Sequence, residues 1–268
     1  MTNAKKLVLA GDHQQLPPVV LSEKSHDAGL GVSFMEKVAP IYPECVSFLS
    51  TQFRSHADIS NWSSGQFYEG KLSADPSVAA TLLADLPGVR RSTETVTPFL
   101  FIDTAGAEYY EQMQIEVNPA ISESDQSITN YNEAFVIDQL VQKYVSLGVK
   151  PSDIGVIAPY WAQVSLIRAL LWDEERRGEY SGVEVRTVDG FQGREKELIL
   201  LSFVRSNPDG VIGFLEESRR INVSVTRARK CCIIVGDSET LARNNKPLRS
   251  LVDYCKDIGA HIHVNEVM

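Results

Sequence analysis

Short apolar runs alternate with segments of helical periodicity over most of the chain. Apolar, strand-like runs lie at 99–103, 154–158, 183–188, 198–204 and 230–236, and polar or glycine-bearing residues follow them. Between them, 135–145 and 161–171 carry apolar residues at helical spacing. This alternation predicts right-handed βαβ units, and therefore an α/β fold with a mainly parallel sheet and helices on both faces.

The first fifty residues predict less regular structure. Residues 7–10 have the pattern of a buried parallel strand that ends in Gly11 and Asp12, and 45–49 also resembles a strand. A short helix is expected around 34–38. The stretch 107–129 has few consecutive apolar residues, which predicts a loosely ordered acidic surface insertion. Asn130 has the position of a helix cap before the helix that Gly148 closes.

The segment from 183 to 236 concentrates the chemistry of the chain. Two predicted strands flank a polar turn with Gly190, Gly193, Arg194 and Glu195. Glycines allow backbone amides to approach a ligand closely, so such a turn suits phosphate or ribose contacts.

A helix is expected after this segment, with a buried stripe of Ile221, Val225 and Ala228 at i, i+4 and i+7. Arg220 and Arg227 would then lie seven residues apart on a neighbouring face, from which both could reach one anion. The alternative is that the run of cations at 219–230 is only a solvated helix face.

A second phosphate-binding pattern is misleading. Residues 65–72, GQFYEGKL, match the spacing GxxxxGK but end in Leu72 where a P-loop needs Ser or Thr to bind Mg²⁺. Two bulky aromatic residues inside the loop would also obstruct phosphate. We interpret this segment as a helix end and a turn.

Composition and charge narrow the class of protein. The chain has 268 residues, 43% of them hydrophobic, and a formal net charge of -9. Residues 92–142 contain nine acids and no Lys or Arg, whereas 186–230 contain nine basic against six acidic residues. A local basic surface is therefore compatible with an acidic chain. No apolar run approaches the length of a membrane span, so we expect a cytoplasmic or nuclear protein.

The four cysteines, Cys45, Cys231, Cys232 and Cys255, lack CxxC spacing and are expected to be buried reduced thiols. His261 and His263 alternate along a short terminal stretch. They could form a metal pair, but an edge-strand role is favoured, and we expect no metal site.

Four ordered segments carry a family resemblance: LVLAGDHQQLPP at 7–18, TQFRSH at 51–56, VDGFQGREKE at 188–197 and SRRINVSVTRAR at 218–229. They resemble motif III, the start of the second domain, motif V and motif VI of superfamily 1B helicases of the up-frameshift type. The sequence between these four segments is most similar to the immunoglobulin-mu-binding-protein type of DNA/RNA helicase. The resemblance covers nearly the whole chain and specifies a RecA-like fold of the P-loop NTPase superfamily.

The resemblance implies a role for individual residues around ATP. Gln15 would sense the terminal phosphate, and Arg54 and Arg227 would be the arginine fingers. Phe53, where the family usually has Tyr, would stack on adenine, although a core aromatic is the alternative. Glu195, with Gly193, would contact the ribose or nearby groups.

The strand ends at the edge of the predicted sheet would carry the nucleic-acid contacts. By the same resemblance, Thr187, Pro159 and Tyr160 touch the backbone of single-stranded DNA or RNA. Residues 1–50 would be a remnant of the first RecA-like domain and the crossover, and 51–268 the second RecA-like domain.

Two parts of a complete ATPase are not in this sequence. It contains no GxxxxGK[ST] motif and no Asp-Glu metal-binding pair before Gly11, so the ligands of Mg²⁺ are expected from a missing first domain. The resemblance thus implies the C-terminal portion of an ATP-dependent 5′-to-3′ helicase, as a truncated product or an incomplete gene model, that does not hydrolyse ATP alone. The alternatives are a non-catalytic module that binds nucleic acid or protein, and a nucleotide-binding protein with no nucleic-acid role.

Overall fold

The computed structural model describes residues 5–18, 20, 22–114, 127–173, 176 and 178–267. The chain divides into two units, Met1–Leu49 and Ser50–Met268, and each is described by itself.

The first unit contains two short helices, α1 (Glu23–Asp27) and α2 (Phe34–Val38), and the second of these confirms the predicted helix. The predicted strands at 7–10 and 45–49 were wrong, because no described residue before Thr51 belongs to a strand. Val8 is 90% exposed, and Cys45 lies in a turn of 3₁₀ helix with an exposed thiol, contrary to the expected burial. An apolar run becomes a strand only when neighbouring strands supply the ladder of hydrogen bonds.

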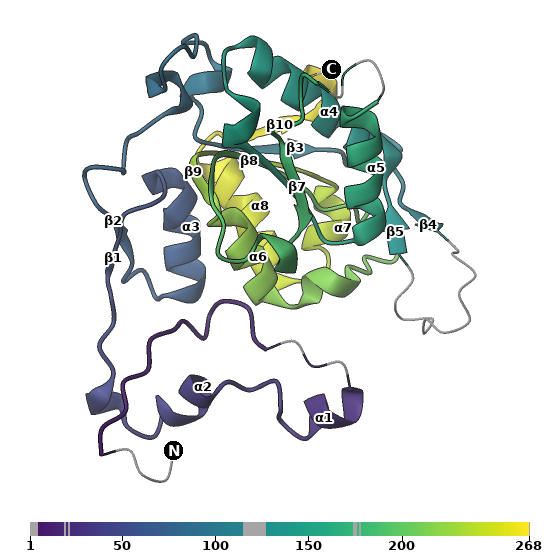
Figure 1. The fold of residues 1–268 in the computed structure, drawn as a ribbon. Coiled ribbons are helices and arrows are strands. Elements are labelled where there is room, and N and C mark those ends of the chain that lie inside the picture. The colour runs from purple at the N-terminus through teal and green to yellow at the C-terminus, as the bar shows by residue number, and fades with distance from the viewer. Residues whose placement is uncertain are drawn as a thin grey trace. The chain divides into compact units, whose positions relative to one another are not determined.

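The second unit is built on a six-stranded parallel sheet with the order β10-β3-β9-β8-β6-β7 (Figure 1). Its strands are β3 (Phe99–Asp103), β6 (Ile154–Ala158), β7 (Glu184–Thr187), β8 (Lys196–Ser202), β9 (Ala228–Gly236) and β10 (His261–His263). All five neighbouring pairs are parallel, which confirms the predicted α/β class. The two histidines lie in edge strand β10, where His261 stacks on Phe101 with ring centroids 5.5 Å apart.

Helices cover both faces of this sheet. On one face, α4 and α5 bury the side chains of Val156, Leu200 and Ile233 in the main hydrophobic cluster. The other face carries α3, α6 and α8, and a hydrogen bond of 3.3 Å from Trp62 Nε1 to Ser250 Oγ ties α3 to α8 (Figure 1). The helices of this unit are α3 (Ala57–Phe67), α4 (Tyr131–Ser146), α5 (Trp161–Leu171), α6 (Ser218–Val225), α7 (Ser238–Ala242) and α8 (Lys246–Asp257).

Two small sheets accompany the main one. Strands β1 (Thr51–Gln52) and β2 (Ser73–Ala74) are parallel, and β4 (Gln112–Gln114) and β5 (Ser127–Thr129) are antiparallel. Strands β4 and β5 both lie within the segment 107–129 that is predicted as an acidic insertion. Residues 115–126 of that insertion lie outside the described residues.

Local signals set the ends of α4 as the sequence predicts. The side chain of Asn130 accepts a hydrogen bond from the backbone amide of Glu133 at 3.0 Å, which caps the first turn. After the helix, Gly148 has φ +98°, a conformation that glycine adopts readily. Phe135, one of the apolar residues of this helix, is 40% exposed.

The expected arrangement of Arg220 and Arg227 on one helix was wrong. Helix α6 ends at Val225, Thr226 and Arg227 form a turn, and Ala228 opens β9. Ala228 pairs with Lys196 of β8, and this non-local contact ends the helix although the apolar spacing continues. The helix end and turn predicted at 65–72 are present, because α3 ends at Phe67 and Gly70 has φ +72°.

Candidate nucleotide and nucleic-acid site

The loop after β1 is shaped by one side-chain amide. Gln52 Oε1 accepts hydrogen bonds from the backbone amides of Arg54, at 2.7 Å, and Ser55, at 2.8 Å. Its Nε2 donates to the carbonyl of Ser55 at 2.7 Å. The amide of Gln52 therefore fixes the backbone on which Phe53 and Arg54 stand.

Two further bonds fasten this loop to the beginning of β9. Ser55 Oγ donates to the carbonyl of Ala228 at 2.7 Å, and the amide of His56 donates to the carbonyl of Arg229 at 2.8 Å. Segments 173 residues apart in the sequence are thereby held side by side. As a result Arg54 lies next to the turn that carries Arg227, and its Nη1 donates to the carbonyl of Thr226 at 3.3 Å.

Glu195, in the loop between β7 and β8, is shared by two arginines. One carboxylate oxygen binds Arg54 Nε, and the other lies 3.2 Å from Nη1 of Arg229. Arg229 Nε also lies 3.3 Å from one carboxylate oxygen of Glu197, and Lys230 Nζ lies 2.7 Å from the other. The side chains of Arg54 and Glu195 are each 37% exposed, so this pair faces solvent.

Arg227 is buried, with 3% of its surface exposed, and its guanidinium donates hydrogen bonds to oxygens of neutral groups. Nε donates to the carbonyl of Val223 at 2.9 Å, and Nη1 donates to the carbonyl of Arg194 at 3.4 Å. Within the described part of the chain no carboxylate forms an ion pair with it. Burial and then repulsion from Arg54 lower the pKa of Arg227 to about 10, while Glu195 opposes the shift.

Together these groups form a cluster of positive charge. Four cations, Arg54, Arg227, Arg229 and Lys230, meet two carboxylates, Glu195 and Glu197, which leaves a formal charge of +2. At neutral pH Arg227 remains charged but incompletely neutralised. A phosphate group would supply the missing negative charge, so the residues present fit an anionic ligand such as a polyphosphate.

The other predicted nucleotide contacts lie in different places. Phe53 is 66% exposed, which excludes the alternative that it is a core aromatic. Gly193 is exposed with φ +75°, in the turn next to Arg194 and Glu195. Gln15 belongs to the first unit, where its Nε2 donates to Asp12 Oδ2 at 2.9 Å.

The predicted nucleic-acid contacts lie at the carboxyl ends of β6 and β7. Ala158 pairs with Thr187, so the turn that begins at Pro159 adjoins Thr187, whose hydroxyl accepts a bond from the amide of Gly190 at 3.3 Å. Pro159 is buried. The hydroxyl of half-buried Tyr160 accepts a bond from Arg205 at 3.1 Å.

Comparison with known proteins decides the family. Residues 30–239 match the family described as AAA domain. The chain belongs to this family. Its similarity to curated helicases further places it among the superfamily 1B helicases, in the C-terminal part of their core, and makes this AAA domain RecA-like.

The curated relatives are much longer than this chain. It is 45% identical over 260 residues to the DNA-binding protein SMUBP-2 of Rattus norvegicus, which covers 97% of the chain and 25% of that protein. It is 38% identical over 264 residues to the DNA polymerase alpha-associated DNA helicase A of Saccharomyces cerevisiae, covering 94% of the chain and 37% of the helicase. The Regulator of nonsense transcripts 1 homolog of Neurospora crassa is 38% identical to the chain over 242 residues, which covers 90% of the chain and 21% of that protein.

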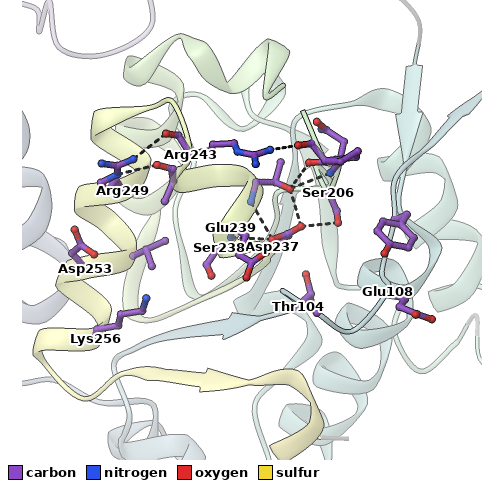
Figure 2. Close-up of a pocket in the computed structure, with 17 residues that line it drawn as sticks. Thr104, Glu108, Ser206, Asp237, Ser238, Glu239, Arg243, Arg249, Asp253 and Lys256 are labelled. Carbon is purple, nitrogen blue, oxygen red and sulfur yellow. Dashed lines mark hydrogen bonds between the residues drawn. The ribbon is translucent and has the colours of Figure 1, made fainter. Parts of the chain in front are cut away.

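The AAA domain also has a cavity of about 760 Å³ at the carboxyl ends of β3 and β9 (Figure 2). Asp237 lies at its centre and accepts hydrogen bonds from Ser206 Oγ and Thr240 Oγ1, both at 2.8 Å. Acidic Glu108, Glu239 and Asp253 line it together with basic Arg243, Arg249 and Lys256. With Asp237 the lining has four carboxylates against three cations, a formal charge of -1, so the cavity lacks the excess of positive charge that the arginine cluster has.

Sequence reasoning missed the residues that position the arginines. Gln52 and Ser55 lie inside the recognised TQFRSH segment, but their roles depend on contacts with the loop backbone and with β9. The burial of Arg227 was also missed. None of the helices in the described ranges could span a membrane, and no group of three or more His, Cys, Asp or Glu there is placed to hold a metal ion.

Proposed function

We propose that this chain supplies the second RecA-like domain of an ATP-dependent 5′-to-3′ helicase acting on DNA or RNA. The observation that carries the proposal is the meeting of Arg54 and Arg227, which come from two distant segments and join in one cluster with surplus positive charge. Paired guanidinium groups of this kind stabilise the charge that develops on a phosphoryl group during transfer.

Each predicted nucleotide contact has a proposed task. Arg54 and Arg227 neutralise the γ-phosphate of ATP in the transition state, Phe53 stacks on adenine, and Glu195, with Gly193, contacts the ribose. Gln15 senses the terminal phosphate from the first unit. Mg²⁺ and the P-loop belong to the first RecA-like domain of the complete core, of which we propose that residues 1–50 are the last part and 51–268 the second domain.

The nucleic-acid path is proposed at the opposite ends of the strands. Thr187 and Tyr160 offer hydroxyl groups to the backbone of a single strand, and buried Pro159 shapes the turn that presents Tyr160. Single-stranded DNA or RNA is the proposed partner, in the cytoplasm or the nucleus.

ATP hydrolysis by a joined core tests this function. The chain is fused behind a helicase first domain that carries a P-loop, and turnover is measured with and without single-stranded DNA or RNA. Activity is expected only in the fused form. Arg227→Ala should reduce kcat by a factor of about 10³ or more, since an arginine finger contributes on this order, and should spare nucleic-acid binding.

Arg91→Ala is the matched control, because the side chain of Arg91 is 68% exposed and pairs with Asp85 at 3.8 Å on a different part of the surface. It should leave turnover unchanged. Equal losses of turnover and nucleic-acid binding in Arg227→Ala would contradict the role assigned to Arg227. Salt-dependent strand binding with no turnover in the fused core would favour the non-catalytic module.

A further inference from the structure

Trp161 is an exposed tryptophan at the carboxyl edge of the sheet. It is the first residue of α5, three positions after the end of β6, and 61% of its surface is exposed. The two other tryptophans, Trp62 and Trp172, are buried and half-buried. A ring with this exposure has a face that is accessible to a ligand.

A cation holds this ring in place. The guanidinium carbon of Arg168 lies 5.1 Å from the centroid of Trp161 and 5.7 Å from that of Trp172. Arg168 is itself fixed, because Nη2 donates to the carbonyl of Val185 in β7 at 2.6 Å. Covering the open edge of β7 is a sufficient role for Arg168 and Trp172. That role does not require an exposed ring at position 161.

The position of Trp161 relative to β7 suggests what it binds. Ala158 and Thr187 are register partners at the ends of neighbouring strands, which are about 4.8 Å apart. The turn from β6 into α5 therefore brings Trp161 to the sheet edge at which Thr187 ends β7.

The same edge strand carries surplus positive charge. Glu184 of β7 is contacted by Arg186 at 2.6 Å, Arg194 at 2.7 Å and Lys196 at 3.5 Å. These three cations and one carboxylate have a formal charge of +2. Glu184 and Arg186 alternate with Val185, which packs with α5, so this cluster lies on the other face of β7 and the cation beside the ring is Arg168. An aromatic ring with a guanidinium against it can bind a single strand, because a base stacks on the ring and a phosphate can meet the cation.

We propose that Trp161, held from behind by Arg168, is a stacking platform for a nucleobase of a single-stranded nucleic acid. The inference rests on the proposed function for its ligand and adds a residue and a type of contact that the motif residues Thr187, Pro159 and Tyr160 do not supply. Stacking recognises the base and not the phosphate, so it predicts a preference for strands that have bases.

Fluorescence anisotropy with the full chain tests the platform. The probes are a fluorescein-labelled 15-nucleotide thymidylate strand, an abasic strand of equal length and charge, and the uridylate RNA strand. The native chain is expected to bind the thymidylate strand roughly ten-fold tighter than the abasic strand, which corresponds to one stacked base. Trp161→Ala should remove this preference, and Trp161→Phe should keep most of it.

Tyr131→Ala is the control, because Tyr131 is also an exposed aromatic residue at the first position of a helix, with 51% of its surface exposed. It should keep the preference for bases. Tryptophan fluorescence gives a second readout, since the thymidylate strand should quench it in the native chain and not in Trp161→Phe. The comparison of thymidylate with uridylate distinguishes DNA from RNA as the source of the base.

Equal affinity of the native chain for the thymidylate and abasic strands would overturn the platform and leave the proposed helicase function standing. Binding of neither strand would count against both. A preference for bases that survives in Trp161→Ala would assign the stacking to another residue.

Discussion

The guanidinium of Arg54 binds the carboxylate of Glu195, which lies 141 residues further along the chain. The same carboxylate contacts Arg229 at 3.2 Å. Glu195 thus binds the same cations that a phosphate group would need. It competes with an anionic ligand for Arg54 and Arg229 while it lowers the repulsion among the arginines.

Removing this carboxylate should strengthen the binding of a simple polyphosphate. Glu195→Gln is expected to bind tripolyphosphate about five-fold tighter than the native chain, because the loss of one nearby charge is worth about 1 kcal/mol at a solvent-exposed site. Isothermal titration calorimetry measures the difference. Glu69→Gln, which disrupts an exposed pair with Lys71, is the control and should change nothing. Weaker binding by Glu195→Gln would show that Glu195 organises the cluster more than it competes with the ligand.

The hydrogen bond that anchors the loop of Arg54 to β9 should contribute measurably to the stability of the fold. Ser55→Ala leaves the buried carbonyl of Ala228 without the hydroxyl that now binds it at 2.7 Å, so we expect a loss of about 1–3 kcal/mol in the free energy of unfolding. Ser73→Ala removes an exposed bond of 3.3 Å to the carbonyl of Ser50 and should cost less than about 0.5 kcal/mol. Urea denaturation followed by circular dichroism compares the two, and equal costs would contradict the anchoring role.

Gly148 should not tolerate a side chain. A Cβ atom there would lie 2.2 Å from the carbonyl oxygen of Gly88, and the residue has φ +98°. Gly148→Ala should therefore cost about 2 kcal/mol or more. Gly65→Ala, in helix α3 with open space around the added methyl group, should instead stabilise the fold by about 0.5–1 kcal/mol. Thermal unfolding of both variants checks the opposite signs.

Glu133 should make stability fall as the pH rises. Burial raises its pKa to about 8 from 4.5, the negative charges of Asp237 and Glu111 add to the rise, and bonds from Ser202 and Val204 oppose it. Between these two pH values the folded chain holds a proton that the unfolded chain releases. The free energy of unfolding from this group therefore decreases by about 1.4 kcal/mol per pH unit up to pH 8.

Glu133→Gln cannot lose a proton and removes this dependence. Relative to the native chain, its stability should improve steadily from pH 5 to pH 8 and remain level above that value. Urea denaturation at a series of pH values measures the difference. Parallel pH profiles for the two proteins would show that Glu133 is ionised in the folded state at neutral pH.

The sheet and its helices could be predicted because their signals are local. The apolar runs at 99–103 and 154–158 became strands, and Asn130 caps α4 as its position predicts. The prediction of a strand at 7–10 was wrong, because an apolar run forms a strand only where neighbouring strands pair with it. Sequence patterns can identify a segment that is able to form a strand, but not whether its partners are available.

The geometry of the arginines could not be predicted because distant contacts determine it. The spacing of Ile221, Val225 and Ala228 favours a helix through position 228, and no Gly or Pro marks its end. The pairing of Ala228 with Lys196 ends α6 early and turns Arg227 inward. The family motifs identified Arg54 and Arg227, but their burial, their neighbours and the anchoring by Ser55 depend on the folded chain.

Strand β9 joins the two edges of the sheet at which the proposed sites lie. Arg227 precedes its first residue, Asp237 follows its last, and its nine residues span roughly 26 Å at about 3.3 Å per residue. Strands β3 and β8 flank it on both sides, so it cannot lengthen without breaking their ladders of hydrogen bonds. The arginine cluster and the opposite edge of the sheet must therefore move as one rigid body, and in the proposed helicase any movement that links them has to be a displacement of this whole domain against another.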